Sequence, residues 1–151
     1  RKKRSKIIDK LETVPIFNQG EKLYLQVLNQ IIDLCNYHKK TFIYLFQPSL
    51  FATSKELSIY ETAAYRRQNN FFGETEEKKN YRIDQFKKFY NNFGKKCSDL
   101  VVSKGSYIID LDKKFSLIPR TTDLFYDESH YFETGNKIIG EEISKFISKN
   151  I

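Results

Sequence analysis

The residues best suited to chemistry lie near the C-terminus, in the run DLFYDESH at residues 123–130. One of the two histidines of the chain, His130, follows Asp127 by three residues. In a loop ahead of a helix, this spacing can bring the Asp127 carboxylate to Nδ1 of the imidazole, which leaves Nε2 able to take a proton from a nucleophile. A surface ion pair is the alternative, so the surroundings of the pair must decide between the two interpretations.

Two short apolar segments predict buried strands that could position this loop. Residues 41–46, TFIYLF, are β-branched, aromatic or aliphatic and are closed by Gln47 and Pro48. Residues 107–111, YIIDL, follow a turn at Gly105 and have the same character. Each segment comes after a stretch with helical periodicity, an order that favours a parallel α/β layer.

Apolar residues that recur every three or four positions predict the helices. The expected helices cover residues 21–38, about 55–68, 76–103 and 134–148. Gly94 is a possible interruption of the third, and Thr134 is the expected N-cap of the last. The second helix lies in a polar excursion, residues 49–80, that lacks strand periodicity.

Length, composition and charge limit the classes of protein to which this chain could belong. At 151 residues the chain has the size of a single domain. The absence of Met and the abrupt start at Arg1 suggest that this domain, residues 1–151, is a piece that is incomplete at its N-terminus. The net charge of +7 raises the possibility of an anionic partner, but most lysines occur in pairs mixed with acids, as on solvated helix faces. We therefore expect no nucleic-acid partner.

The stretch DLFYDESHYFETGN, leading into the last helix, resembles the C-terminal block of SGNH (GDSL-type) hydrolases, in which Asp and His of a catalytic triad lie three residues apart and a glycine follows. A strand that ends in Gln-Pro, a variable excursion, and a strand closed by the acidic Asp112 precede it in the same order, so the resemblance covers about residues 21–149. By this match Asp127 is the orienting acid and His130 the general base.

The resemblance implies a three-layer α/β/α sandwich with a flavodoxin-like parallel sheet, of which only the C-terminal part is present. Ligands of such sheets collect beyond the carboxyl ends of the strands, so Gln47, Pro48 and Ser49 are expected to border the substrate. The implied activity is hydrolysis or acyl transfer of a small-molecule or carbohydrate ester through an acyl-enzyme, with no cofactor and no metal. The family's Gly-Asp-Ser block is not visible, so the nucleophilic serine is expected outside this sequence.

Two other classes of protein remain open on the sequence. One is a carbohydrate- or partner-binding module that keeps the hydrolase scaffold without a nucleophile. The other is a basic nucleic-acid-binding domain, in which the 23 aromatic residues (13 Phe and 10 Tyr) could stack on bases. The sequence leaves the membrane association, oligomeric state and compartment undetermined.

Overall fold

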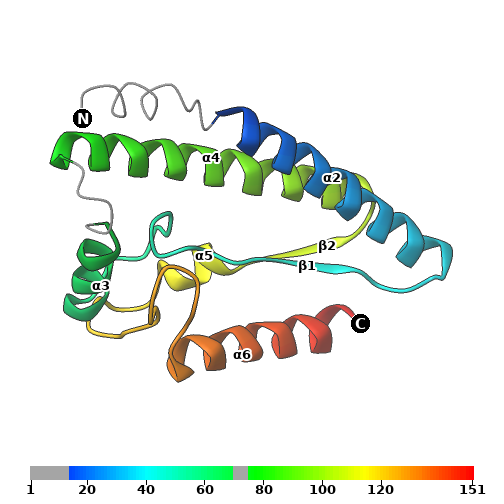
Figure 1. Ribbon diagram of the computed structural model, residues 1–151. Coiled ribbons are helices and arrows are strands. Elements are labelled where there is room, and N and C mark those ends of the chain that lie inside the picture. Colours follow the sequence, from blue (N-terminus) through cyan, green and yellow to red (C-terminus); the bar gives the residue numbers. More distant parts are fainter. Residues whose placement is uncertain (1–13, 70–74) are drawn as a thin grey trace. The chain divides into compact units, whose positions relative to one another are not determined.

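A computed structural model describes residues 14–69 and 75–151 of the chain (Figure 1). The chain divides into two compact units, Arg1–Phe42 and Ile43–Ile151. The described part of the first unit contains helix α2 (Val14–Tyr37). The helix predicted for residues 21–38 is therefore confirmed, and it begins earlier than its apolar periodicity indicated.

The second unit is built around a short parallel pair of strands. Its elements are β1 (Ile43–Phe46), α3 (Ile59–Asn69), α4 (Glu76–Ser103), β2 (Tyr107–Asp110), α5 (Leu111–Phe115) and α6 (Glu133–Asn150). The register pairs Ile43 with Tyr107 and Phe46 with Asp110. Helix α4 contacts both strands and α6 contacts β2, and Figure 1 shows these two helices on opposite sides of the strands.

The fold class expected from the resemblance is wrong for this chain. In place of a three-layer α/β/α sandwich with a flavodoxin-like parallel sheet, the described residues are mostly helical and carry a sheet of two strands. The physical reason is visible in the apolar pattern, because continuous strand-like runs occur only near residues 41–46 and 107–111. Most other apolar residues recur at helical spacing, which buries one face of a helix instead of extending a sheet.

The ends of several elements differ from the prediction. Strand β2 ends at Asp110 because the Asp110 carboxylate accepts a hydrogen bond from the Lys113 amide and caps α5, a helix that was not predicted. Helix α6 begins at Glu133, with Phe132 at the N-cap position, so the prediction of Thr134 as N-cap was wrong.

Gly94 does not interrupt α4, which runs unbroken from Glu76 to Ser103. A Cβ atom at this position would overlap the ring of Phe46. The glycine therefore allows α4 to approach β1 closely, and this packing role explains its presence inside a helix.

The core of the second unit lies beneath the Asp127–His130 loop. Phe115 and Phe125 are completely buried, and their rings meet edge to face with a centroid separation of 5.8 Å. The ring of Tyr131 contacts both of them. Leu50, Ala64 and Leu124 complete the buried cluster. Aromatic pairs in this geometry add to the stabilisation from burial alone, so the loop rests on a well-packed base.

Candidate active site

The loop that carries Asp127 and His130 is closed by backbone hydrogen bonds between its two arms. Phe125 forms an antiparallel bridge with Tyr131. The Phe132 amide donates to the Leu124 carbonyl at 2.8 Å, and the Tyr126 amide donates to the His130 carbonyl at 2.9 Å. The tip, residues 126–130, is therefore a tight turn held at its base by a short hairpin.

Asp127 closes the tip with its side chain. Its Oδ1 atom accepts hydrogen bonds from the amides of Ser129, at 2.9 Å, and His130, at 2.8 Å, an Asx-type turn that short acidic side chains favour. Burial raises the pKa of this carboxyl, but the Ser129 amide and the imidazole and amide of His130 outweigh it, and the net pKa lies below the usual value. Asp127 is therefore an anion at neutral pH.

The imidazole of His130 lies against this carboxylate. Its Nδ1 atom is 2.9 Å from Oδ1 and 2.8 Å from Oδ2 of Asp127. A carboxylate only accepts hydrogen bonds, so neutral His130 must carry its proton on Nδ1 and leave the Nε2 lone pair free. The side chain of His130 is 76% exposed, whereas that of Asp127 is 26% exposed. Among the described residues, no side chain forms a hydrogen bond to Nε2.

The segment after β1 lies beside this loop. The Gln47 side-chain amide donates to the Ser129 carbonyl at 3.3 Å, and the Tyr131 hydroxyl donates to the Pro48 carbonyl at 2.5 Å. The Leu50 amide donates to the Glu128 carbonyl at 3.0 Å. The structure thus brings Gln47 and Pro48 to the Asp127–His130 loop, although their role in substrate binding remains a prediction.

Two hydroxyl groups near the loop do not have the contacts of an activated nucleophile. The hydroxyl of Ser49 accepts a hydrogen bond from the Phe51 amide at 3.3 Å and so takes part in a local turn. Ser129 contributes its backbone to the loop. In the part of the chain that the structure describes, neither serine hydroxyl is hydrogen-bonded to His130.

Sequence reasoning missed two acidic residues: Glu61, which binds the arm of the loop, and Asp112, which binds the segment after β1. Asp112, noted only as the end of a strand, accepts hydrogen bonds from Thr53 and Ser54, which lie after the Gln47–Ser49 segment. Glu61 contacts the backbone just ahead of Asp127. The motif Ser-x-x-Glu at residues 58–61 was a detectable signal, because it is the pattern of a helix capping box.

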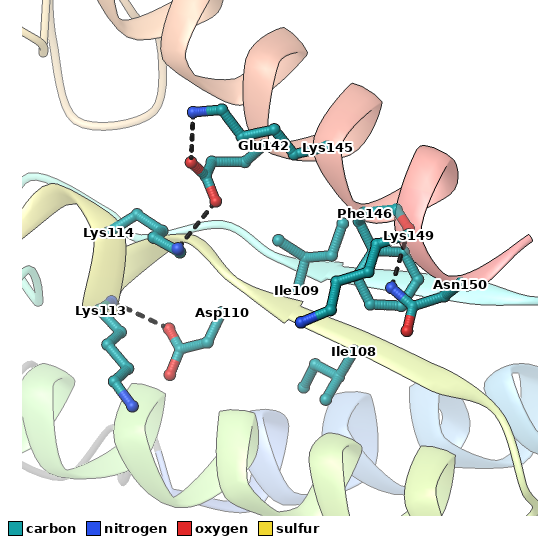
Figure 2. Close-up of a pocket in the computed structure, with 10 residues that line it drawn as sticks. All are labelled: Ile108, Ile109, Asp110, Lys113, Lys114, Glu142, Lys145, Phe146, Lys149 and Asn150. Atoms are coloured by element: carbon teal, nitrogen blue, oxygen red, sulfur yellow. Dashed lines mark hydrogen bonds and ion pairs between the residues drawn. The ribbon is translucent and has the colours of Figure 1, made fainter.

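A separate cavity of about 580 Å³ lies between β2, α5 and α6 and is drawn in Figure 2. Four lysines line it, at positions 113, 114, 145 and 149. Glu142 neutralises part of their charge through contacts of 2.9 Å to Lys114 and 3.3 Å to Lys145. Neither Asp127 nor His130 borders this cavity, so it is distinct from the candidate active site.

Comparisons with models of protein families, with curated proteins and with solved structures give no match for this chain. The resemblance to SGNH hydrolases therefore rests on the motif and the order of the elements alone. Among residues 14–69 and 75–151, no three His, Cys, Asp or Glu side chains are grouped as a metal site would require. No helix in those ranges is both long enough and apolar enough to cross a bilayer.

Proposed function

We propose that Asp127 and His130 form the acid and base of a serine-hydrolase triad of the SGNH type. The observation that carries the proposal is the contact of 2.8 Å between Nδ1 of His130 and the Asp127 carboxylate, together with the exposure of the His130 side chain, which is 76%. In triads of this kind the carboxylate fixes the tautomer and stabilises the imidazolium, and Nε2 accepts the proton of the attacking hydroxyl.

The proposed reaction is hydrolysis or acyl transfer of a small-molecule or carbohydrate ester. A serine outside residues 1–151 attacks the ester carbonyl while His130 takes its proton, and the alcohol leaves with that proton as the acyl-enzyme forms. Water, activated by the same base, then releases the acid. Gln47, Pro48 and Ser49 border the substrate in this scheme. Gln47 contacts Ser129 and Pro48 contacts Tyr131, and Ser49 is flanked by Pro48 and by Leu50, whose amide donates to Glu128.

The test is labelling of the intact natural protein with a fluorophosphonate probe, followed by mapping of the modified residue. We expect label on a serine outside residues 1–151. His130→Ala should abolish labelling, and Asp127→Asn should slow it by about 10⁴-fold, the loss found when a triad histidine is held in the wrong tautomer. His38→Ala is the matched control, because it removes the other histidine of the chain and should label like wild type.

A second candidate, a binding module for carbohydrates or a protein partner, is favoured by the lack of a hydroxyl contact to His130 among the described residues. The same experiment separates the two. A folded, intact protein that takes no label, and whose ester turnover does not change in His130→Ala, would contradict the hydrolase proposal and favour the binding module.

A further inference from the structure

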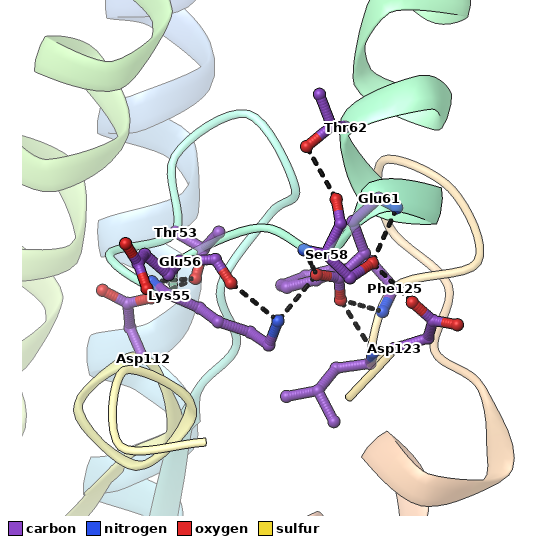
Figure 3. A network of polar contacts seen from close by, with 10 residues as sticks. Thr53, Lys55, Glu56, Ser58, Glu61, Thr62, Asp112, Asp123 and Phe125 are labelled. Atoms are coloured by element: carbon purple, nitrogen blue, oxygen red, sulfur yellow. Dashed lines mark hydrogen bonds and ion pairs between the residues drawn. The ribbon is translucent and has the colours of Figure 1, made fainter. Parts of the chain in front are cut away.

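Glu61, in the first turn of α3, is a fully buried carboxylate whose two oxygens are both occupied. Oε2 accepts hydrogen bonds from Nζ of Lys55, at 2.7 Å, and from the Ser58 amide, at 2.8 Å. Oε1 accepts the amides of Leu124, at 2.7 Å, and Phe125, at 3.0 Å. Figure 3 shows this network, in which the Lys55 and Glu61 side chains are both 0% exposed.

Half of this network is a helix cap. The Ser58 hydroxyl accepts the Glu61 amide at 3.0 Å, and the Glu61 carboxylate accepts the Ser58 amide in return, as in a capping box. A capping box uses one carboxylate oxygen. The other oxygen of Glu61 binds amides 63 and 64 residues further along the chain, so capping of α3 does not account for the whole arrangement.

The two distant amides belong to the arm of the hairpin that leads to Asp127. Leu124 and Phe125 are completely buried, so without Glu61 their amides would lack both a protein acceptor and water. An unsatisfied buried donor is strongly unfavourable, and this arm would have to move to avoid it. The Ser58 hydroxyl adds a second link to the same arm, because it donates to the carboxylate of Asp123.

We propose that Glu61, with Lys55 as its buried counter-ion, is the positioning residue that fixes the 124–132 loop and thereby holds the His130 imidazole on the Asp127 carboxylate. The chemical purpose of this arrangement rests on the proposed hydrolase function. Burial raises the pKa of Glu61, but the Lys55 ammonium and the three amides outweigh it, so the net pKa is lowered and the anion persists at neutral pH. Glu61 itself does not reach the imidazole and is not a catalytic residue.

The test uses the tautomer of His130, measured from imidazole ¹⁵N shifts of the intact protein at about pH 8.5, where an ordinary histidine is neutral. The variant is Lys55→Met together with Glu61→Met, which replaces the buried ion pair with apolar side chains of similar length and avoids a stranded charge. The matched control is the exposed Glu56→Met, five residues before Glu61. His38 provides an internal reference in every spectrum.

In wild type and in Glu56→Met we expect His130 to be mainly the Nδ1–H tautomer. In the double variant that signal should shift toward the Nε2–H form of a free imidazole, and the Ser129 and His130 amides should exchange with solvent about tenfold faster, because their bonds to Asp127 loosen. Neither amide touches Glu61, so a purely local cap would leave both unchanged.

A folded double variant with wild-type His130 shifts and wild-type exchange at Ser129 would overturn the proposal. If the double variant does not fold, Glu61→Gln is used instead. It keeps the shape of the side chain but turns an amide N–H₂ toward buried donors. The His130 shifts and the exchange of the Ser129 and His130 amides are then measured on this variant. Failure of the hydrolase function is a different outcome: wild type would take no fluorophosphonate label while the tautomer of His130 still depended on Glu61.

Discussion

Gly135 allows helix α6 to pack against the loop that carries His130, and its replacement by Ala is the sharpest stability test that the structure offers. The residue is buried in the first turn of α6. An ideal Cβ atom placed on it would lie 2.9 Å from the Leu124 carbonyl oxygen and 2.9 Å from Cβ of Tyr131. Both neighbours are well inside the roughly 3.5–4.0 Å at which carbon contacts are favourable, so one arm of the hairpin must move.

The magnitude follows from comparison with Gly140→Ala in the same helix. A Cβ atom at Gly140 meets nothing within 4 Å, so that variant should gain about 0.5–1 kcal/mol from the better helix propensity of Ala. Gly135→Ala has a similar gain but adds an overpacking term of about 1–3 kcal/mol. The difference between the two variants isolates the steric term, and a difference of about 2 kcal/mol corresponds to about 4–8 °C in Tm for a chain of this size.

The assay is urea and thermal unfolding followed by near-UV circular dichroism, which reports on the packed tyrosines and phenylalanines. Gly140→Ala should melt above wild type and Gly135→Ala below it. Equal stability of the two variants, or a higher Tm for Gly135→Ala, would refute the close approach between α6, Leu124 and Tyr131 on which the reasoning depends.

Three further changes test the same region. Tyr131→Phe removes the donor to the Pro48 carbonyl and should lower the free energy of unfolding by about 1–3 kcal/mol in urea; an unchanged value would mean that this bond is not formed. Phe115→Ala empties the centre of the core and should lower it by about 3–5 kcal/mol, and a loss below about 1 kcal/mol would contradict its burial. The pKa of Glu61 is lowered on folding, so its contribution is complete above its ordinary pKa near 4.5 and is lost as pH falls through the lower folded value. The stability advantage of wild type over Glu61→Gln should therefore shrink in acid in urea unfolding at about pH 3–6, and a constant advantage would mean that Glu61 is not ionised in the native state.

Local pattern predicted most helices and both strands, because the periodicity of apolar residues reflects which face of an element is buried. It did not predict α5, whose five residues are too short to show a period. The start of α3 was predictable in principle, since the Ser-x-x-Glu motif places Ser58 at the N-cap and the first helical residue at Ile59. The fold class failed for another reason: it was inferred from a family resemblance, whereas residues 14–69 and 75–151 form a sheet of two strands.

The side-chain contacts that hold the loop and the segment after β1 could not be predicted, because they connect residues far apart in sequence. No periodicity relates Glu61 to the Leu124 and Phe125 amides, or Asp112 to Thr53. Such pairs arise from packing of the whole unit, which buries backbone donors that then require an acceptor. The Ser-x-x-Glu motif at residues 58–61 signals the cap of α3, but nothing in the sequence indicates that the second oxygen of Glu61 binds Leu124 and Phe125.

The pair of Asp127 and His130 was accessible to sequence reasoning because its geometry is local. Asp127 binds the amides of Ser129 and His130 within one turn, so the carboxylate is fixed before any substrate arrives, and the imidazole is oriented on it. Orientation is one requirement of a triad, and exclusion of water is another. With its side chain 76% exposed, His130 meets the first requirement in the described residues and does not meet the second. Under the proposed function, the segment that brings the nucleophilic serine to Nε2 must also cover the imidazole. The same segment therefore supplies the nucleophile and excludes water from the base.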